Sequence, residues 1–272
     1  MATKATIETP KLDADYQPVQ NKHSLGHWVR EYGWRHLVGV IIVIYALVPI
    51  VYILSASLNP GGTLTGSNQL FQTIDFSNYQ NLSSTMFWHW MGNSLVIAIS
   101  VSVGTVLMAA AAAYAFSRFR FTGRRFGLTA LLIIQMFPQM LAFVAIFLLL
   151  LSLGDVVPIL GVNSTLALIA VYLGGALGVN TFLLYGFFIT IPKELDEAAK
   201  IDGRTHGQIY WQIILRLCAP NLSVVALLSF ISTFGEFVIA RVILQHEQNW
   251  TVAIGLYSCV ASRLDANWGQ FA

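Results

Sequence analysis

Residues 92–116 read GNSLVIAISVSVGTVLMAAAAAYAF, a run of 25 residues that contains no Asp, Glu, Lys or Arg. A helix of about 20 mostly apolar residues crosses the roughly 30 Å hydrocarbon core of a bilayer. In lipid only helices satisfy all of their own backbone hydrogen bonds, and the strands of a membrane barrel would read as short alternating segments. The run therefore predicts a transmembrane helix.

Four similar apolar runs lie on either side of this one, at residues 37–58, 126–151, 166–191 and 222–240. In the whole chain 56% of residues are hydrophobic and only 10% are charged, whereas a soluble domain carries about 25% charged residues. We therefore expect an all-α integral membrane protein, a transmembrane helix bundle with five visible spans over residues 36–272. The polar segment 1–35 lacks the apolar region of a cleavable signal peptide, so the first span is expected to be an uncleaved anchor.

The lysines and arginines are distributed unevenly between the two sides that five alternating spans would create. The N-terminal tail, the loop after the second span and the segment after the fourth span hold 13 of the 15 basic residues. These are Lys4, Lys11, Lys22, Arg30, Arg35, Arg118, Arg120, Arg124, Arg125, Lys193, Lys200, Arg204 and Arg216. Because cytoplasmic loops carry the excess of basic residues, we expect a multi-pass plasma-membrane protein with a cytoplasmic tail at residues 1–35. The net charge of +2 is too small to indicate a nucleic-acid partner.

The opposite side carries only Arg241 and Arg263. Its first loop, residues 59–89, has no lysine or arginine and contains several aromatic residues, Trp88 among them. Trp88 and Trp90 fit an interfacial aromatic belt, and for the rest of the loop two interpretations stay open, such a belt and a docking surface for an external partner. Residues 268–272 resemble the start of another element, which leaves either five spans or a sixth that this chain lacks.

Residues 192–220, called the elbow below, form the longest inner segment between two spans. Pro192 suits the first turn of a helix, and three carboxylates follow it where they complement the positive end of the helix dipole. These are Glu194, Asp196 and Glu197. Gly203 suits the end of this helix, and Thr205 with Gln208 makes a capping-box pattern that starts a second one. The segment therefore predicts two short helices that meet at a glycine.

Two roles are open to the elbow: docking onto another protein, or lying flat on lipid headgroups as an amphipathic helix. Docking is favoured because the first helix is acidic and anionic headgroups would repel it. Ala198 and Ala199 add a small-residue surface that can lie close to a partner. The sequence has no G-x-x-x-x-G-K-[ST] phosphate loop, so an ATPase that drives the elbow would be a separate protein.

Three residues within the predicted spans are candidates for a transport pathway or a gate. Glu236 lies in the fifth run, and a charge at membrane depth is costly unless it faces water or the bundle interior. A position of Glu236 near the outer interface is the equally weighted alternative. Gln135 and Pro138 interrupt the third run, and transporter pathways often use such breaks. For Pro138 alone a purely structural kink is the favoured interpretation.

The elbow contains Glu197-Ala198-Ala199, then Gly203, then Ile213 and Leu215, a pattern that resembles the EAA loop of ATP-binding-cassette (ABC) importer permeases. Arg216 stands where that family usually has proline. Other stretches are similar to the maltose/maltodextrin (MalG-like) family of carbohydrate permeases. They are residues 113–124 (AYAFSRFRFTGR), 135–138 (QMFP), 172–175 (YLGG) and 268–272 (WGQFA).

This resemblance implies a type I ABC importer permease, whose sixth span would follow the last motif. It implies a transport subunit rather than an enzyme, one that moves a malto-oligosaccharide or related sugar inward across a bacterial plasma membrane. The implied partners are a second permease subunit, a dimer of ATPase subunits that binds ATP and Mg, an extracellular sugar-binding protein and membrane lipid. No cofactor or metal is expected in this chain. The implied ATPase-coupling residues are Glu197, Ala198, Ala199, Asp202 and Gly203.

The alternative is an ion-coupled secondary transporter, which needs no ATPase. That class commonly places several ionisable groups near the middle of the membrane. This chain offers Glu236 as a single candidate, so the ABC permease is the favoured hypothesis.

Overall fold

The computed structural model describes residues 26, 32–59, 70–71, 74–137 and 139–261, and all regular secondary structure in these residues is helical. The chain divides into two compact units, Met1–Leu54 and Ser55–Ala272, and each is described by itself. The main element of the first unit is α2 (Trp34–Ser57), a 24-residue apolar helix whose last three residues belong to the second unit. Its length and composition match the first predicted span.

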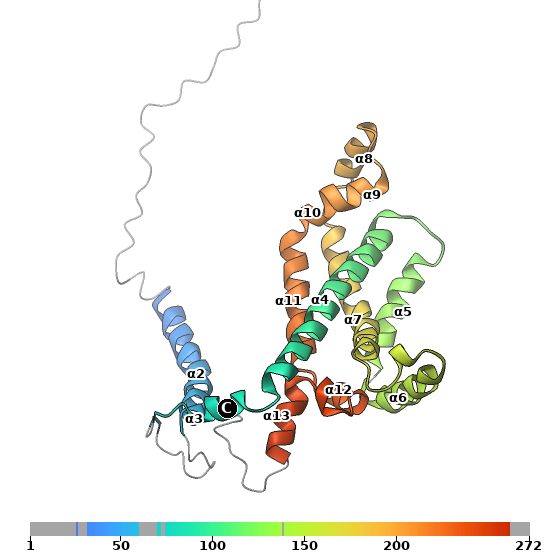
Figure 1. The fold of residues 1–272 in the computed structure, drawn as a ribbon. Helices are drawn as coiled ribbons and strands as arrows, with labels where there is room; N and C mark the ends of the chain where they lie inside the picture. The colour runs from blue at the N-terminus through green and yellow to red at the C-terminus, as the bar shows by residue number, and fades with distance from the viewer. Residues whose placement is uncertain (1–25, 27–31, 60–69, 72–73, 138, 262–272) are drawn as a thin grey trace, which may run out of the picture. The chain divides into compact units, whose positions relative to one another are not determined.

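The second unit is a helix bundle in which α4 packs along both α7 and α11 (Figure 1). Its elements in chain order are α3 (Ser77–Ser83), α4 (Phe87–Arg118), α5 (Arg124–Met136), α6 (Gln139–Val156), η2 (Pro158–Leu160), α7 (Thr165–Phe188), α8 (Glu194–Ile201), α9 (His206–Ile209), η3 (Tyr210–Ile214), α10 (Leu215–Leu217), α11 (Ala219–Phe234), α12 (Val238–Ile243), η4 (Glu247–Asn249) and α13 (Val252–Ala261).

Two buried clusters lie along α4, one toward each of its ends. Toward the C-terminal end, Ala109 and Ala113 pack in one cluster with Phe188 of α7. Toward the N-terminal end, Ile97 packs in the other cluster with Ala240 of α12. Small residues let helix backbones approach closely. This close packing favours helix association in a bilayer, where the hydrophobic effect does not drive helices together. The alanine-rich part of the second span is therefore a packing surface.

Length and composition identify three single helices that could cross a membrane, α2, α4 and α7, and up to five spans if two bent pairs are counted. The third predicted span is one of these pairs, since the helices on either side of its break meet at 100°. The interruption of the run 126–151 that the sequence predicted is therefore confirmed, and it divides the run into α5 and α6. Pro138 falls at the break in sequence and lies outside the described residues.

The fifth predicted span, 222–240, differs from the structure. α11 ends at Phe234, and its N-terminal end continues at a bend of 78° from the helical limb His206–Leu217. A three-residue break, 235–237, separates α11 from α12. Glu236 therefore lies between two helices rather than inside one. A carboxylate suits this position, because the first backbone N–H groups of α12 have no partner within the helix.

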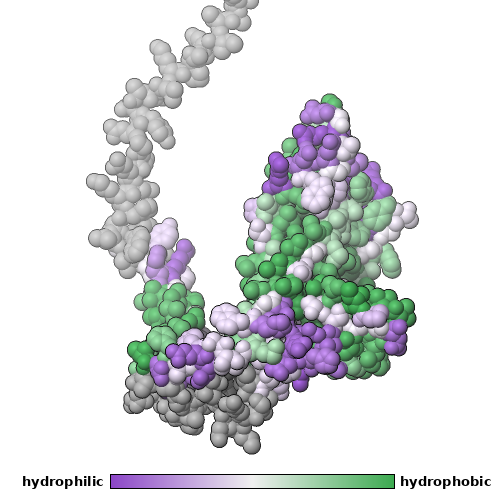
Figure 2. All heavy atoms as spheres, viewed as in Figure 1, coloured by the Kyte–Doolittle hydropathy of each residue, from purple (hydrophilic) through white to green (hydrophobic). Residues whose placement is uncertain are grey.

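Hydrophilic residues gather at the two ends of the second unit, with a hydrophobic band between them (Figure 2). The end of α4, the start of α5 and the elbow carry the basic residues of one end, including Arg118 and Arg216. Arg241 lies in α12 at the other end. Within this unit the basic residues are therefore separated as the sequence predicted. The tail 1–25 and residues 268–272 lie outside the described residues.

Candidate functional site

The elbow begins with α8, which carries its three carboxylates in the first turn as predicted. The helix ends before Gly203, whose φ is +77°. The Gly203 N–H donates to the carbonyl oxygen of Lys200 at 3.0 Å and closes the last turn. Only glycine adopts this left-handed conformation at little cost, so Gly203 allows the sharp turn between α8 and α9.

The second limb of the elbow begins with the predicted capping box. The Gln208 N–H donates to the Thr205 hydroxyl at 3.3 Å, and the Thr205 N–H donates to the Gln208 side-chain oxygen at 2.8 Å. The limb continues through the π-helical turn η3 and through α10 into α11. Single π-helical turns are frequent at functional sites.

The five predicted coupling residues do not all face outward. Glu197, Ala198, Asp202 and Gly203 are exposed. Ala199 is only 5% exposed and packs into the core cluster of this chain, so its expected place on a partner-facing surface is corrected. The side of α8 that carries Ala199 faces α4, and sequence spacing alone does not reveal which side that is.

Ile201, the last residue of α8, was not singled out from the sequence. It is 88% exposed, the largest value among the exposed large hydrophobic residues of the described chain. Exposed aliphatic side chains are common one at a time. Here the side chain sits beside Ala198 and Asp202 on a protruding element, so it joins exposed Leu195 in giving apolar contacts to a surface that also carries charged residues.

A buried ion pair, also missed from the sequence, holds α8 to α4. Arg118 Nε lies 2.7 Å from Asp196 Oδ2, and the two side chains are 5% and 10% exposed. Arg118 Nη2 also donates to the carbonyl oxygen of Ile191 at 3.1 Å. The available signals were the basic end of α4 and the acidic start of α8, but their pairing depends on the fold.

The second limb rests on the same end of α4. The Tyr114 hydroxyl donates to the carbonyl oxygen of His206 at 3.3 Å. The Tyr114 ring lies 5.1 Å from the ring of Tyr210, and the Phe119 ring meets the His206 ring edge-on at 5.1 Å, each distance measured between centroids. Both limbs of the elbow are thus in contact with the C-terminal end of α4.

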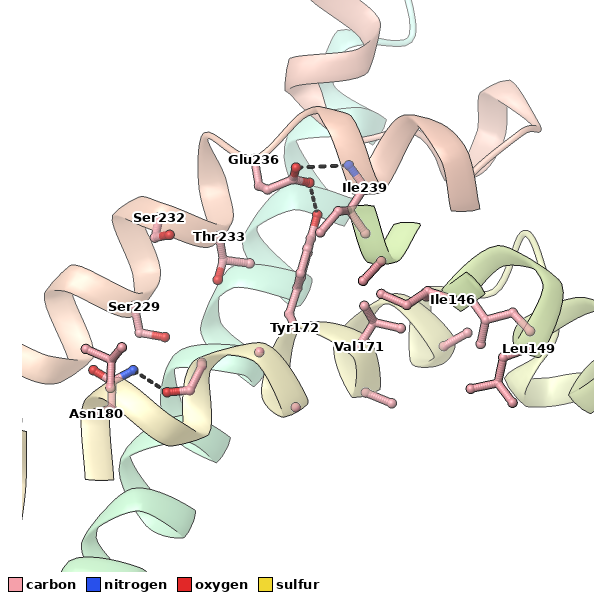
Figure 3. Close-up of a pocket in the computed structure, with 18 of the residues that line it drawn as sticks. Ile146, Leu149, Val171, Tyr172, Asn180, Ser229, Ser232, Thr233, Glu236 and Ile239 are labelled. Atoms are coloured by element: carbon pink, nitrogen blue, oxygen red, sulfur yellow. Dashed lines mark hydrogen bonds between the residues drawn. The ribbon is translucent and has the colours of Figure 1, made fainter. Parts of the chain in front are cut away.

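A cavity of about 750 Å³ lies among α6, α7, α11 and the start of α12 (Figure 3). Most of its lining is apolar, and its polar groups come from α7, from α11 and from the break after α11. They are Tyr172, Asn180, Ser229, Ser232, Thr233 and Glu236. A mostly apolar cavity with a few convergent polar groups is typical of a ligand site.

Glu236 lines this cavity and also caps α12. Its carboxylate accepts hydrogen bonds from the backbone N–H groups of Ile239 at 2.9 Å and Ala240 at 3.0 Å. It accepts a third from the hydroxyl of Tyr172 on α7 (Figure 3). The Glu236 carboxylate therefore faces the cavity and also fixes the break after α11 through its bonds to α12 and α7.

Gln135, the second candidate for the pathway, does not line the cavity. Its Nε2 donates to the carbonyl oxygen of Gly175 on α7 at 2.6 Å. It also packs on Gly178, where an added Cβ would lie 2.7 Å from Gln135 Cγ. The structure thus brings Glu236 to the cavity and Gln135 to a contact between α5 and α7, while Pro138 lies outside the described residues. Among the residues described, no group of three or more His, Cys, Asp or Glu side chains could hold a metal ion.

Known proteins resemble this chain in both sequence and structure. The family described as "binding-protein-dependent transport system inner membrane component" matches residues 105–258. The galactooligosaccharides transport system permease protein GanQ of Bacillus subtilis is 37% identical over 236 residues, which are 85% of this chain and 80% of that protein. The maltodextrin transport system permease protein MdxG of the same species is 36% identical over 76% of this chain and 74% of its own length. A chain of a bacterial ABC transporter involved in the import of the acidic polysaccharide alginate shares the fold, with a TM-score of 0.75, 24% identity and 92% of both chains covered.

Proposed function

The chain belongs to the family of binding-protein-dependent transport system inner membrane components, and from this premise we propose that it imports a malto-oligosaccharide or a related oligosaccharide. It is a permease subunit of an ABC importer and not itself an enzyme. The family assignment gives no support to the ion-coupled alternative. The substrate class is supported by two relatives, whose names state galactooligosaccharides and maltodextrin.

The proposed partners follow from the same assignment. A second permease subunit completes the pathway, a dimer of ATPase subunits binds ATP and Mg, and an extracellular sugar-binding protein delivers the substrate. The N-terminus and the elbow lie in the cytoplasm of a bacterial cell, in agreement with the basic residues at the elbow end of the second unit.

The observation that carries the coupling part of the proposal is the protruding elbow with its exposed acidic and apolar face. Glu197, Ala198, Ile201 and Asp202 contact the ATPase subunit, and Gly203 sets the angle of the turn. Ala199 contributes from the inside, by packing α8 onto its own chain. The exposed carboxylates Glu194, Glu197 and Asp202 suit basic side chains of a protein partner better than anionic lipid.

The cavity beside Glu236 is the proposed contribution of this chain to the sugar pathway. Hydroxyl, amide and carboxylate groups are the hydrogen-bonding partners that a sugar requires, and the cavity offers six side chains of these kinds. Glu236 acts there as a pathway residue whose position is set by α12 and Tyr172. Gln135 acts on the pathway indirectly, by holding α5 against α7, and Pro138 stays a predicted pathway residue.

Reconstitution of the complex tests this function. A complex isolated through an affinity tag on this chain is placed in liposomes with ATP on the ATPase side, and uptake of labelled maltotriose is measured against a panel of unlabelled sugars. We expect uptake that needs ATP and the binding protein and that persists when ion gradients are collapsed. Uptake driven by an ion gradient without ATP, or a complex without a nucleotide-binding subunit, would contradict the proposal.

A further inference from the structure

We infer that Arg118 is a positioning residue for energy coupling: it fastens the elbow to α4, so that a push on α8 displaces this transmembrane helix directly. The inference rests on the proposed function and names the element of this chain that receives the motion. It concerns how the elbow is held within the chain, and not which residues contact the ATPase.

The contacts of Arg118 reach two separate parts of the chain. Arg118 is the last residue of α4. Its Nε pairs with Asp196 in the first turn of α8 at 2.7 Å, and its Nη2 binds the carbonyl oxygen of Ile191, after the end of α7, at 3.1 Å. The guanidinium reaches both acceptors at once through different nitrogens, which the single ammonium group of a lysine does not reproduce. One side chain therefore joins α4, the connection after α7 and α8.

The second limb makes an independent attachment to the same helix end. Tyr114 of α4 binds the carbonyl oxygen of His206 at the start of α9. Ala199 from α8 and Ile209 from α9 are both buried in the core cluster that contains Ala113 of α4. Any rocking of the elbow relative to α4 would break contacts in both limbs, so the two elements are expected to move together.

The chemistry of the ion pair indicates that it fixes the position of α8 on α4 rather than adding much to the stability of the fold. The desolvation of two buried charges offsets much of their attraction, so a buried ion pair is a weak source of net stability. Asp196 Oδ1 and the Nε and Nη1 atoms of Arg118 are also buried without a hydrogen-bond partner among the described residues, so the 2.7 Å contact is an ion pair rather than an aligned hydrogen bond, which adds to that cost. What the pair provides is a preferred placement of α8 relative to α4, because moving α8 away would leave the buried guanidinium and the buried carboxylate without their opposite charge.

A double-mutant cycle on the reconstituted complex tests this role. The variants are Arg118→Gln, Asp196→Asn and the double variant, and the readout is the number of ATP molecules hydrolysed per sugar imported. We expect each single change to raise this ratio by about tenfold, which lies within the usual range of coupling free energies. The double variant should be no worse than either single variant, because the same contact is lost in all three. Arg118→Lys, which keeps the charge but not the fork, should restore part of the coupling.

Arg120→Gln is the matched control, since Arg120 is an exposed arginine two positions along the chain. It removes the same charge just beyond the end of α4 and should leave the ratio unchanged. The complex must still contain the ATPase subunits in every variant, which gel analysis of the purified complex checks. If Arg118→Gln accumulates poorly, the near-isosteric Asp196→Asn and the charge-preserving Arg118→Lys still decide the question.

Three outcomes would overturn the inference: a wild-type ratio in Arg118→Gln and Asp196→Asn, effects of the two changes that simply add, or an equal loss in the control. Failure of the proposed function is seen separately, as the absence of ATP-dependent uptake by the unmodified complex. The two failures are therefore distinguishable.

Discussion

Replacing Gly203 by valine should loosen the elbow by about 1–2 kcal/mol, the usual cost of placing an L-residue in the left-handed region. The φ of Gly203 is +77°, and a β-branched residue is especially unfavourable there. A Cβ at this position would meet no other atom within 4 Å, so the cost is backbone strain rather than a clash. The strain is released if α8 and α9 change their relative direction.

Hydrogen exchange followed by mass spectrometry measures this loosening. The backbone N–H groups of Gly203 and Arg204 donate to the carbonyl oxygens of Lys200 and Ala199, each at 3.0 Å. Since about 1.4 kcal/mol is a factor of ten, exchange in the peptide that covers these amides should accelerate about 5- to 30-fold in Gly203→Val. Gly203→Asn should show a smaller effect because asparagine tolerates this region better. The same valine variant should hydrolyse more ATP per sugar than the unmodified complex.

Gly207→Ala is the matched control for this prediction. Gly207 lies in α9 on the other side of the turn, has no positive φ, and offers an added Cβ open space. Alanine should be neutral or stabilise the helix by about 0.4–1 kcal/mol. Unchanged exchange in Gly203→Val, or the same acceleration in both variants, would refute the reasoning.

Two further predictions concern the cavity and its supporting contacts. Gly178→Leu should lower the melting temperature of the complex, because a Cβ there would already lie 2.7 Å from Gln135 Cγ and overpacking costs about 1–3 kcal/mol. The control Gly186→Leu should not lower it, since a Cβ at Gly186 would have no atom within 4 Å. Equal melting temperatures of the two variants would count against the α5–α7 contact. Glu236→Ala should destabilise α12 by about 1 kcal/mol through loss of its cap, whereas Glu236→Gln keeps one of the two acceptor oxygens and should lose less. A thermal-shift measurement checks both, and a Glu236→Ala variant that melts normally would show that the cap contributes nothing.

The long apolar runs could be predicted because the thickness of the hydrocarbon imposes a length that the sequence must meet. The turn of the elbow could be predicted for a similar reason, since Gly203 and the Thr205–Gln208 pair satisfy local backbone requirements. These features involve residues that are neighbours in the chain, and their chemistry does not depend on how the helices pack.

The break in the third run was predicted at Gln135 and Pro138, but its angle was not, and the break in the fifth run was not predicted. A hydropathy pattern records how apolar a segment is, but it does not record the direction of the helix axis. A bend of 100° between α5 and α6 therefore leaves the pattern almost unchanged. The role of Glu236 was open for the same reason: its position between α11 and α12 becomes visible only when the helix ends are known.

The attachment of the elbow to α4 could not be predicted from either segment alone. Arg118 was counted as one of several basic loop residues, and Asp196 as one of three dipole-compensating carboxylates. Their burial together, and that of Ala199 beside them, depends on the contact between α8 and α4. Long-range pairs of this kind require tertiary structure.

Site-specific crosslinking tests the central claim, that the elbow is engaged by a separate ATPase subunit, most directly. A photoreactive amino acid is placed at Ile201, which is 88% exposed on α8. In a control it is placed at Ile159, which is 59% exposed in η2, just before the N-terminal end of α7. The account predicts an adduct with the ATPase subunit from position 201 and none from position 159. An adduct of position 201 with the external binding protein, or with lipid alone, would contradict it.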